Sequence, residues 1–166
     1  MKELYIKQKL LRLNGQFTVK DEQNRDVYEV EGSFLKIPKT FTIRDANQEE
    51  VACITKKTFS FLPTFYVEVQ GQETVTIHKE FTFLKPKYTI DAAGVEVLGN
   101  WWEMSFDVLK DGQVAGTVDK KWFQWGDSYR VQIFDETLET LIVSLVIAID
   151  CVKADQGGAA SAASFG

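Results

Sequence analysis

The hydrophobic pattern is densest near the end of the chain, where residues Leu141–Ile149 read LIVSLVIAI. A helix that is apolar on all sides must be buried on all sides, inside protein or inside lipid. The run is too short for lipid, because a membrane span takes roughly 20 apolar residues. The sequence therefore predicts a helix over residues 137–153 that the rest of the protein surrounds.

A second hydrophobic pattern repeats along the remainder of the chain. An aromatic residue, any residue and then Val or Ile occur in this order six times, and another aliphatic residue lies eleven positions before each aromatic. Alternating apolar and polar positions are typical of strands with one buried face. Each unit therefore predicts a hairpin of two strands. The six aromatic positions are Phe17, Phe41, Phe65, Tyr88, Phe106 and Tyr129.

Six hairpins give about twelve antiparallel strands, and a sheet of that size exposes its edges unless it closes into a barrel. Twelve strands enclose a space wider than their own side chains can fill, and the apolar helix is the segment that fits it. We therefore predict a mainly β protein, a closed antiparallel barrel of six hairpin repeats wrapped around a central C-terminal helix. Residues 1–154 would form this single domain, followed by a flexible tail at 155–166.

Composition and charge narrow the functional classes. The formal net charge of the 166-residue chain is −5, whereas nucleic-acid binding needs a basic face, so we expect no nucleic-acid partner. No apolar leader segment is visible at the N-terminus, which favours a cytoplasmic location. Cys53 and Cys151 have no metal or redox spacing and are expected to be buried free thiols. A closed barrel has no free strand edge, which favours a monomer.

No catalytic arrangement is evident in the sequence. His78 is the single histidine and lies in an alternating strand-like segment, where a surface position is expected rather than a general base. One His and two distant Cys do not make a zinc site, and no Gly-rich phosphate loop precedes a helix. Seven acidic residues fall mostly in the links between hairpins, where they serve turn geometry; they are Asp21, Glu22, Asp26, Asp45, Glu49, Glu50 and Asp91. We expect no enzyme activity, no metal site and no cofactor.

Four segments of the chain resemble one protein family. They read YIKQKL at 5–10, KYTID at 87–91, KKWFQWGDSYRVQI at 120–133 and LIVSLVIAIDCV at 141–152. Together they resemble the LURP-one-related family, which belongs to the tubby C-terminal-like superfamily, over the chain up to about Lys153. The resemblance implies a closed barrel of about twelve strands around a hydrophobic C-terminal helix.

For function the resemblance implies less. The superfamily includes tubby domains, which bind phosphoinositide head groups through basic residues, and relatives of phospholipid scramblases. Short single-domain members are mostly uncharacterised. No tubby lipid-binding motif matches this sequence residue by residue, so the resemblance assigns no site residue.

The lysines give the most specific indication of a site. Lys56-Lys57 and Lys120-Lys121 occupy equivalent places in two repeats, and because side chains alternate along a strand, at least one lysine of each pair faces out of the barrel. Other lysines flank predicted hairpin turns, which would gather at one rim while acidic links gather at the other. The simplest interpretation of these lysines is a solvated surface that protects the strands. The functional interpretation is a basic rim that docks on anionic lipid head groups or a phosphorylated ligand. Its residues are Lys36, Lys39, Lys56, Lys85, Lys87 and Lys120.

Two other functions remain open at this point. Trp101 and Trp122 are out of phase with the predicted core positions, and alternation along a strand would place Trp101 on the face opposite Trp102. These two tryptophans define a hypothetical small-molecule pocket. Alternatively, the protein is scramblase-like and associates with membranes through its C-terminal helix, or it binds an unidentified protein partner.

Overall fold

The computed structural model describes the backbone of residues 1–7, 15–33, 38–57, 64–80, 87–91, 94–123 and 126–163. It describes the side chains of these residues except at 79–80, 87–89, 122–123, 126–127 and 154–163. The helices are the 3-10 turns η2 (Trp101–Glu103) and η3 (Glu136–Leu138) and the α-helix α1 (Glu139–Ala163). The strands are β1 (Lys2–Lys7), β2 (Gln16–Asp21), β3 (Asp26–Ser33), β4 (Lys39–Arg44), β5 (Glu50–Lys57), β6 (Thr64–Val69), β7 (Val75–Glu80), β8 (Lys87–Asp91), β9 (Val95–Asn100), β10 (Ser105–Lys110), β11 (Gln113–Phe123) and β12 (Gly126–Ile133).

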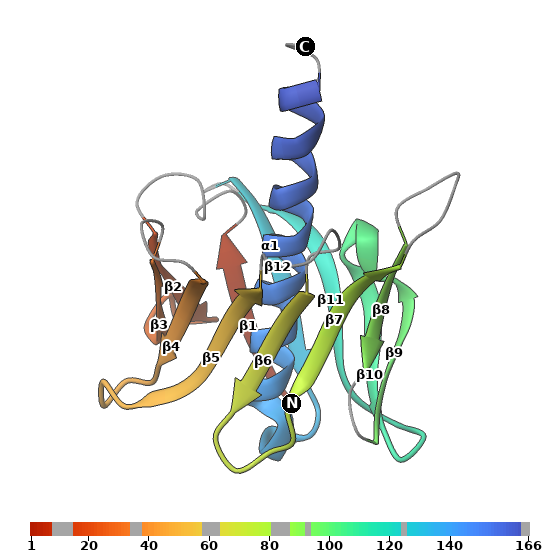
Figure 1. Cartoon of the computed structure of the whole chain (residues 1–166). Coiled ribbons are helices and arrows are strands. Elements are labelled where there is room, and N and C mark those ends of the chain that lie inside the picture. Colours follow the sequence, from red (N-terminus) through yellow and green to blue (C-terminus); the bar gives the residue numbers. More distant parts are fainter. Residues whose placement is uncertain are drawn as a thin grey trace.

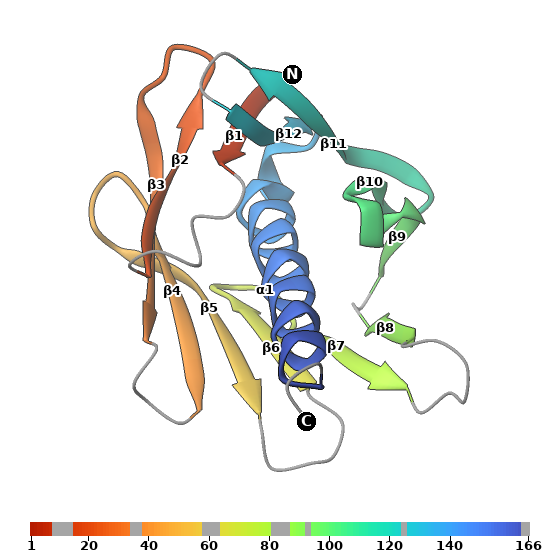
Figure 2. The same cartoon turned by 90° about the horizontal axis from the view of Figure 1, so that it is seen from above.

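All twelve strands belong to one antiparallel sheet that curves around α1 (Figures 1 and 2). The strand order is β8-β7-β6-β5-β4-β3-β2-β1-β12-β11-β10-β9. β1 pairs with β2 on one side and with β12 on the other, so the beginning of the chain joins the last strand. The mainly β barrel around a C-terminal helix is therefore confirmed.

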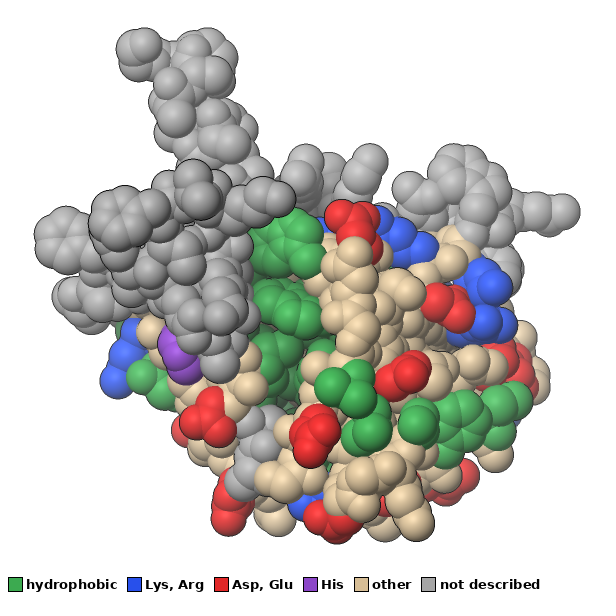
Figure 3. All heavy atoms as spheres, turned by 90° about the vertical axis from the view of Figure 1, so that its right-hand side faces the viewer, with side chains coloured by type: hydrophobic (Ala, Val, Ile, Leu, Met, Phe, Trp, Pro, Cys, Tyr) green, Lys and Arg blue, Asp and Glu red, His purple; other side chains and the backbone are tan. Residues whose placement is uncertain are grey.

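The barrel is nearly closed rather than closed as predicted. β8 and β9 are the two ends of the strand order, and no ladder joins them within the described residues. Apolar side chains flank this seam: Val95, Val97, Trp101 and Trp102 are half-buried and pack against the core. Figure 3 looks at this side and shows hydrophobic side chains reaching the surface there. Between β8 and β9, apolar packing against the core thus takes the place of the strand-to-strand hydrogen bonds that would close the barrel.

The inner face of the barrel follows the predicted alternation. Of the six aromatic positions, the five with described side chains are all buried, and the Val or Ile two residues later is buried with each of them. The sixth unit contributes the half-buried Ile90. That the hairpins are copies of one repeated unit stays a prediction. The five buried aromatics are Phe17, Phe41, Phe65, Phe106 and Tyr129.

The apolar run Leu141–Ile149 is buried throughout, as expected for a central helix. Ser144 is its one polar residue, and its hydroxyl donates a 2.6 Å hydrogen bond to the Thr140 carbonyl oxygen, so no polar group is left unpaired there. α1 continues to Ala163, past the predicted helix end near 153, and projects beyond the barrel (Figure 1). The domain boundary at 154 and the flexibility of residues 155–166 stay predictions. The added segment is rich in alanine, the residue with the highest helix propensity. Residues 164–166 lie outside the described residues.

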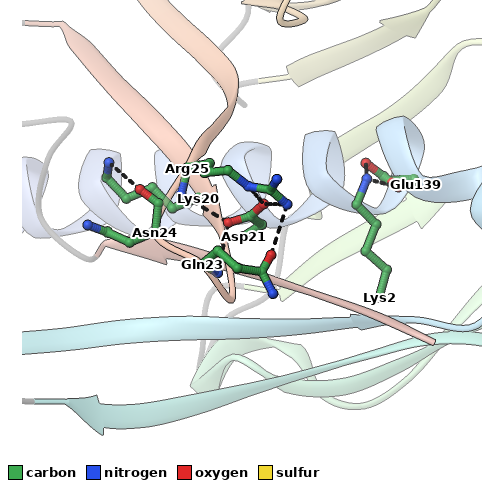
Figure 4. A network of polar contacts seen from close by, with 7 residues as sticks. All are labelled: Lys2, Lys20, Asp21, Gln23, Asn24, Arg25 and Glu139. Carbon is green, nitrogen blue, oxygen red and sulfur yellow. Dashed lines mark hydrogen bonds and ion pairs between the residues drawn. The ribbon is translucent and has the colours of Figure 1, made fainter.

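A buried carboxylate ties α1 to two strands at the helix start (Figure 4). Lys2 Nζ donates to both oxygens of Glu139, at 2.8 and 2.9 Å, and the Tyr28 hydroxyl donates to Oε1 at 2.8 Å. Burial, and then the neighbouring Glu139, raise the pKa of Tyr28, which keeps its hydroxyl protonated as a donor. A carboxylate at a helix N-terminus also interacts favourably with the helix dipole. β1, β3 and α1 are therefore joined through one side chain.

Gly116 lies where β11 passes closest to α1. A Cβ at this position would lie 2.8 Å from Ile142 Cδ1 and 2.9 Å from the backbone oxygen of Gln132. Both distances are shorter than van der Waals contact, so the absence of a side chain lets the wall and the helix approach each other.

Two of the acidic links have the same local structure. Asp21 and Asp45 each accept hydrogen bonds from backbone N–H groups two and four residues later, at 2.9–3.0 Å. Arg25 also donates to Asp21 at 2.7 Å (Figure 4). These hydrogen bonds, with the Arg25 guanidinium, hold the pKa of Asp21 below its usual value. The acidic residues serve turn geometry here, as the sequence predicts.

Gln48 occupies a left-handed position in the second of these turns, with φ +65°, and is exposed. For a residue with a Cβ this conformation costs roughly 1–2 kcal/mol of stability. Glycine avoids that cost but loses about 0.5–1 kcal/mol of stability, because its unfolded chain is more flexible. Gln48→Gly should therefore raise the free energy of unfolding by up to about 1 kcal/mol in urea denaturation. The control Asn47→Gly, at a position without positive φ, should not stabilise the protein. Equal effects at the two positions would contradict the prediction.

Candidate functional site

The lysine-rich end of the barrel is the one from which the C-terminal half of α1 emerges, and we call it the mouth (Figure 1). Lys39 is the first residue of β4, Lys56 lies next to the end of β5, and Lys120 lies towards the end of β11. Lys153 lies on α1, after the buried run. These four residues form the candidate site.

Lys39 and Lys56 are direct cross-strand partners. The next pair along the same face is Phe41 with Ile54, both buried in the core, so the register places the two lysines on the inner face at the mouth. Lys39 is exposed and Lys56 is half-buried. Like charges directly opposite each other on neighbouring strands destabilise a sheet. The strand register therefore places two lysines directly opposite each other at the mouth.

Lys120 continues the inner face of β11, two residues after the buried Val118. Its Nζ lies 4.0 Å from Glu103 Oε2, an exposed pair of little strength. Burial, and then the charge of Lys120, lower the pKa of Lys153. Lys120 on the wall and Lys153 on the helix thus lie close enough for their charges to repel each other.

An acid also faces this part of the mouth. The hydroxyl of Tyr129, the cross-strand partner of Lys120, donates a 2.6 Å hydrogen bond to Asp150 Oδ1 on α1. This contact fixes the helix against the wall one turn before Lys153. The mouth is therefore basic but not uniformly so.

The other lysine of each doublet takes the opposite face, in line with the predicted alternation. Lys57 is exposed, and its Nζ lies 5.1 Å from the centre of the Tyr66 ring, a cation–π contact. Lys121 is half-buried and contributes, after the Tyr5 hydrogen bond and other groups, to the lowered pKa of Glu3 on β1. These outer lysines are available as matched controls for the inner ones.

The remaining predicted lysines cannot be placed in the site from the described side chains. Lys36 and Lys85 lie outside the described residues. Lys87 begins β8 opposite Glu80, but its side chain lies outside the described set. Lys153 was missed by the sequence reasoning, which treated it as the end of the helix. Its position one turn beyond Asp150 on a helix that fills the barrel was the available signal.

The overall fold and these positions can be compared with known proteins. A sequence model of the LURP-one-related family matches residues 2–150. The chain belongs to the LURP-one-related family. Over 152 residues it is 30% identical to the Bacillus subtilis (strain 168) protein named uncharacterized protein YxjI, covering 92% of this chain and 94% of that protein. The likeness therefore extends over nearly the whole domain.

A solved structure resembles this LURP-one-related protein in fold. The X-ray structure of a protein from Arabidopsis thaliana superposes with a TM-score of 0.56 at 15% identity, covering 90% of this chain and 91% of that one. At this identity the similarity supports the fold alone. In the described part of this LURP-one-related protein, no helix has the length and apolar character of a membrane span.

The two tryptophans proposed for a pocket in this LURP-one-related protein have different outcomes. Trp101 and Trp102 lie in η2, not in a strand, and their rings meet edge to face with centres 5.7 Å apart. Asn100 Oδ1 caps this turn by accepting from the Glu103 N–H at 3.2 Å. Trp101 and Trp102 both pack against the core, so the prediction that these two side chains face opposite sides of a strand was wrong. The side chain of Trp122 lies outside the described residues.

Two cavities of about 540 Å³ each lie elsewhere in the domain. One lies at the base of the seam, where Val75, Val95 and Leu141 line it. The other lies on the outer wall between β1 and β2. Neither is lined by Trp101. Within the described residues, no three His, Cys, Asp or Glu side chains gather as a metal-binding group.

Proposed function

We propose that this LURP-one-related protein is a non-enzymatic binding module that docks on anionic lipid head groups through the lysines of its mouth, as a cytoplasmic monomer. The supporting observation is the direct opposition of Lys39 and Lys56. An anion bound between the two ammonium groups would accept hydrogen bonds from both, so the arrangement favours a phosphate-bearing ligand.

The helix side of the mouth supports the same proposal. Lys153 is held partly out of water beside Lys120, and both effects disfavour its charged form. A negative head group placed there would favour the charged form. The strands β4, β5 and β11, which contribute lysines to the mouth together with α1, reach the end of the barrel from which the helix emerges (Figure 1).

The test is co-sedimentation with vesicles of phosphatidylcholine alone and of phosphatidylcholine mixed with phosphatidylserine, across a salt series. The wild type should bind the anionic vesicles and lose binding as salt rises. Each lysine near an anionic membrane contributes about 1 kcal/mol, so the double variant Lys39→Gln with Lys56→Gln should bind roughly thirtyfold more weakly.

Stability separates this effect from unfolding. Replacing both opposed lysines removes a pair of like charges from the ladder, so the double variant should have a free energy of unfolding within about 1 kcal/mol of the wild-type value. The control is Lys57→Gln, which removes the neighbouring charge from the outer face and should change binding far less. Absence of wild-type binding at low salt, or equal losses in the double variant and the control, would refute head-group docking at the mouth.

A further inference from the structure

The outer wall of the barrel opens between β1 and β2. β1 pairs with β12 at six positions, from Lys2 to Lys7, but with β2 at three positions only, from Leu4 to Ile6. The β1–β2 ladder ends at the pair Ile6 and Val19. Beyond that pair lies the cavity of about 540 Å³, within the range of small-ligand sites.

The cavity combines an apolar surface with polar groups. Its apolar part comes from Phe17, which is 7% exposed, and from the half-buried Tyr5. Burial and the hydrogen bond to Glu3 raise the pKa of Tyr5 to about 12, so its ring is neutral at physiological pH. A flat apolar body can stack on such rings.

Most of the charges around the cavity already have partners. Lys20 Nζ lies 2.6 Å from Asp26 Oδ1. Asp21 is occupied by Arg25 and by its turn N–H groups, and Glu29 accepts from the Gln48 amide at 3.1 Å. Lys20 and Asp21 therefore bring no unpaired charge to a ligand, whereas Glu29, whose partner is a neutral amide, keeps its negative charge on the β3 side of the cavity.

Lys7 and Ser128 are different. They are direct partners across β1 and β12, and both line the cavity. Within the described part of the chain, neither side chain has a hydrogen-bond or ion-pair partner, although Ser128 is only 2% exposed. An ammonium and a hydroxyl side by side are donors for one anionic group.

We infer that this cavity binds a small organic anion, one carboxylate, sulfonate or phosphate group on a flat apolar body. The anionic group contacts Lys7 and Ser128, and the body lies on the Tyr5 ring, with the buried Phe17 closing the cavity on its inner side. The site is on the outer wall, separate from the mouth lysines, and does not depend on lipid docking.

The test uses two fluorescent probes that differ in charge, the anionic 8-anilinonaphthalene-1-sulfonate and the neutral N-phenyl-1-naphthylamine. The wild type should bind both saturably at one site. Lys7→Gln should weaken binding of the anionic probe about tenfold, the factor that 1.4 kcal/mol represents, and leave the neutral probe within about twofold. Thr18→Trp, which fills the cavity from its half-buried lining residue, should remove binding of both probes.

Controls separate this site from the mouth and from unfolding. The mouth variant Lys39→Gln with Lys56→Gln should bind both probes like the wild type, whatever its effect on vesicles. Thermal unfolding of each variant shows whether it folds, and if Thr18→Trp does not, the Lys7→Gln comparison decides alone. Unchanged binding of the anionic probe by Lys7→Gln, or unsaturable binding by the wild type, would overturn the inference.

Discussion

Replacing Glu139 with alanine should lower the free energy of unfolding by about 2–3 kcal/mol at neutral pH. Breaking a buried ion pair typically costs about 3–5 kcal/mol, and the lower figure applies because the Lys2 side chain is 37% exposed and can turn to water. The buried Tyr28 hydroxyl would keep only a long contact of 3.4 Å to Thr140. Urea denaturation monitored by tryptophan fluorescence measures the loss.

Two further variants divide this effect into its parts. Glu139→Gln keeps an acceptor for Tyr28 and removes the charge, so its loss should be smaller than that of Glu139→Ala. Lys2→Met, combined with Glu139→Gln in a double-mutant cycle, gives the coupling energy of the ion pair. If the free energy of unfolding of Glu139→Ala lies within about 0.5 kcal/mol of the wild-type value, the network does not stabilise the helix start.

Replacing Gly116 with alanine should destabilise the barrel by a similar amount, about 2–3 kcal/mol. The added Cβ would meet the Gln132 backbone oxygen at 2.9 Å, and this atom belongs to a strand of the sheet that cannot easily shift. The second short distance, 2.8 Å, is to the end of the Ile142 side chain. β11 must therefore shift against β12, and the end of the Ile142 side chain must also give way; thermal unfolding of the variant should show the loss.

The matched test for Gly116 uses its neighbour on the helix. Ile142→Val removes the Cδ1 atom and alone should cost about 0.5–1.5 kcal/mol. In the double variant the combined loss should be smaller than the sum of the single losses, because the clash with Ile142 has been relieved. Strict additivity would show that the wall and the helix do not press together at this point.

The inner face of the barrel was predictable from sequence because burial imposes a strict two-residue period on each strand. Phe17, Phe41 and Phe65 lie where that period places them, and the helix centre follows from its apolar length. The open seam was not predictable in the same way. Hydrogen bonding between β8 and β9 depends on how the strands approach, whereas the apolar residues of β9 satisfy the pattern either way.

The site could be predicted only in part, for a related reason. Alternation shows that Lys56 and Lys57 face opposite sides, but only the register between β4 and β5 shows that Lys39 lies directly opposite Lys56. The cavity beside Lys7 depends on where the β1–β2 ladder stops, which no residue pattern indicates. Trp101 was misplaced because a 3-10 turn interrupts the strand period.

The position of β1 in the sheet has a consequence for the order of folding. Residues 2–7 are held by residues 128–133, so this ladder must close across nearly the whole chain. Hairpins can form early from local contacts, but their inner faces remain without a core until α1 has been synthesised. Contacts of such long sequence separation are associated with slow folding. α1 follows all twelve strands in the sequence, and it is thus the segment that turns a set of separate hairpins into a stable domain.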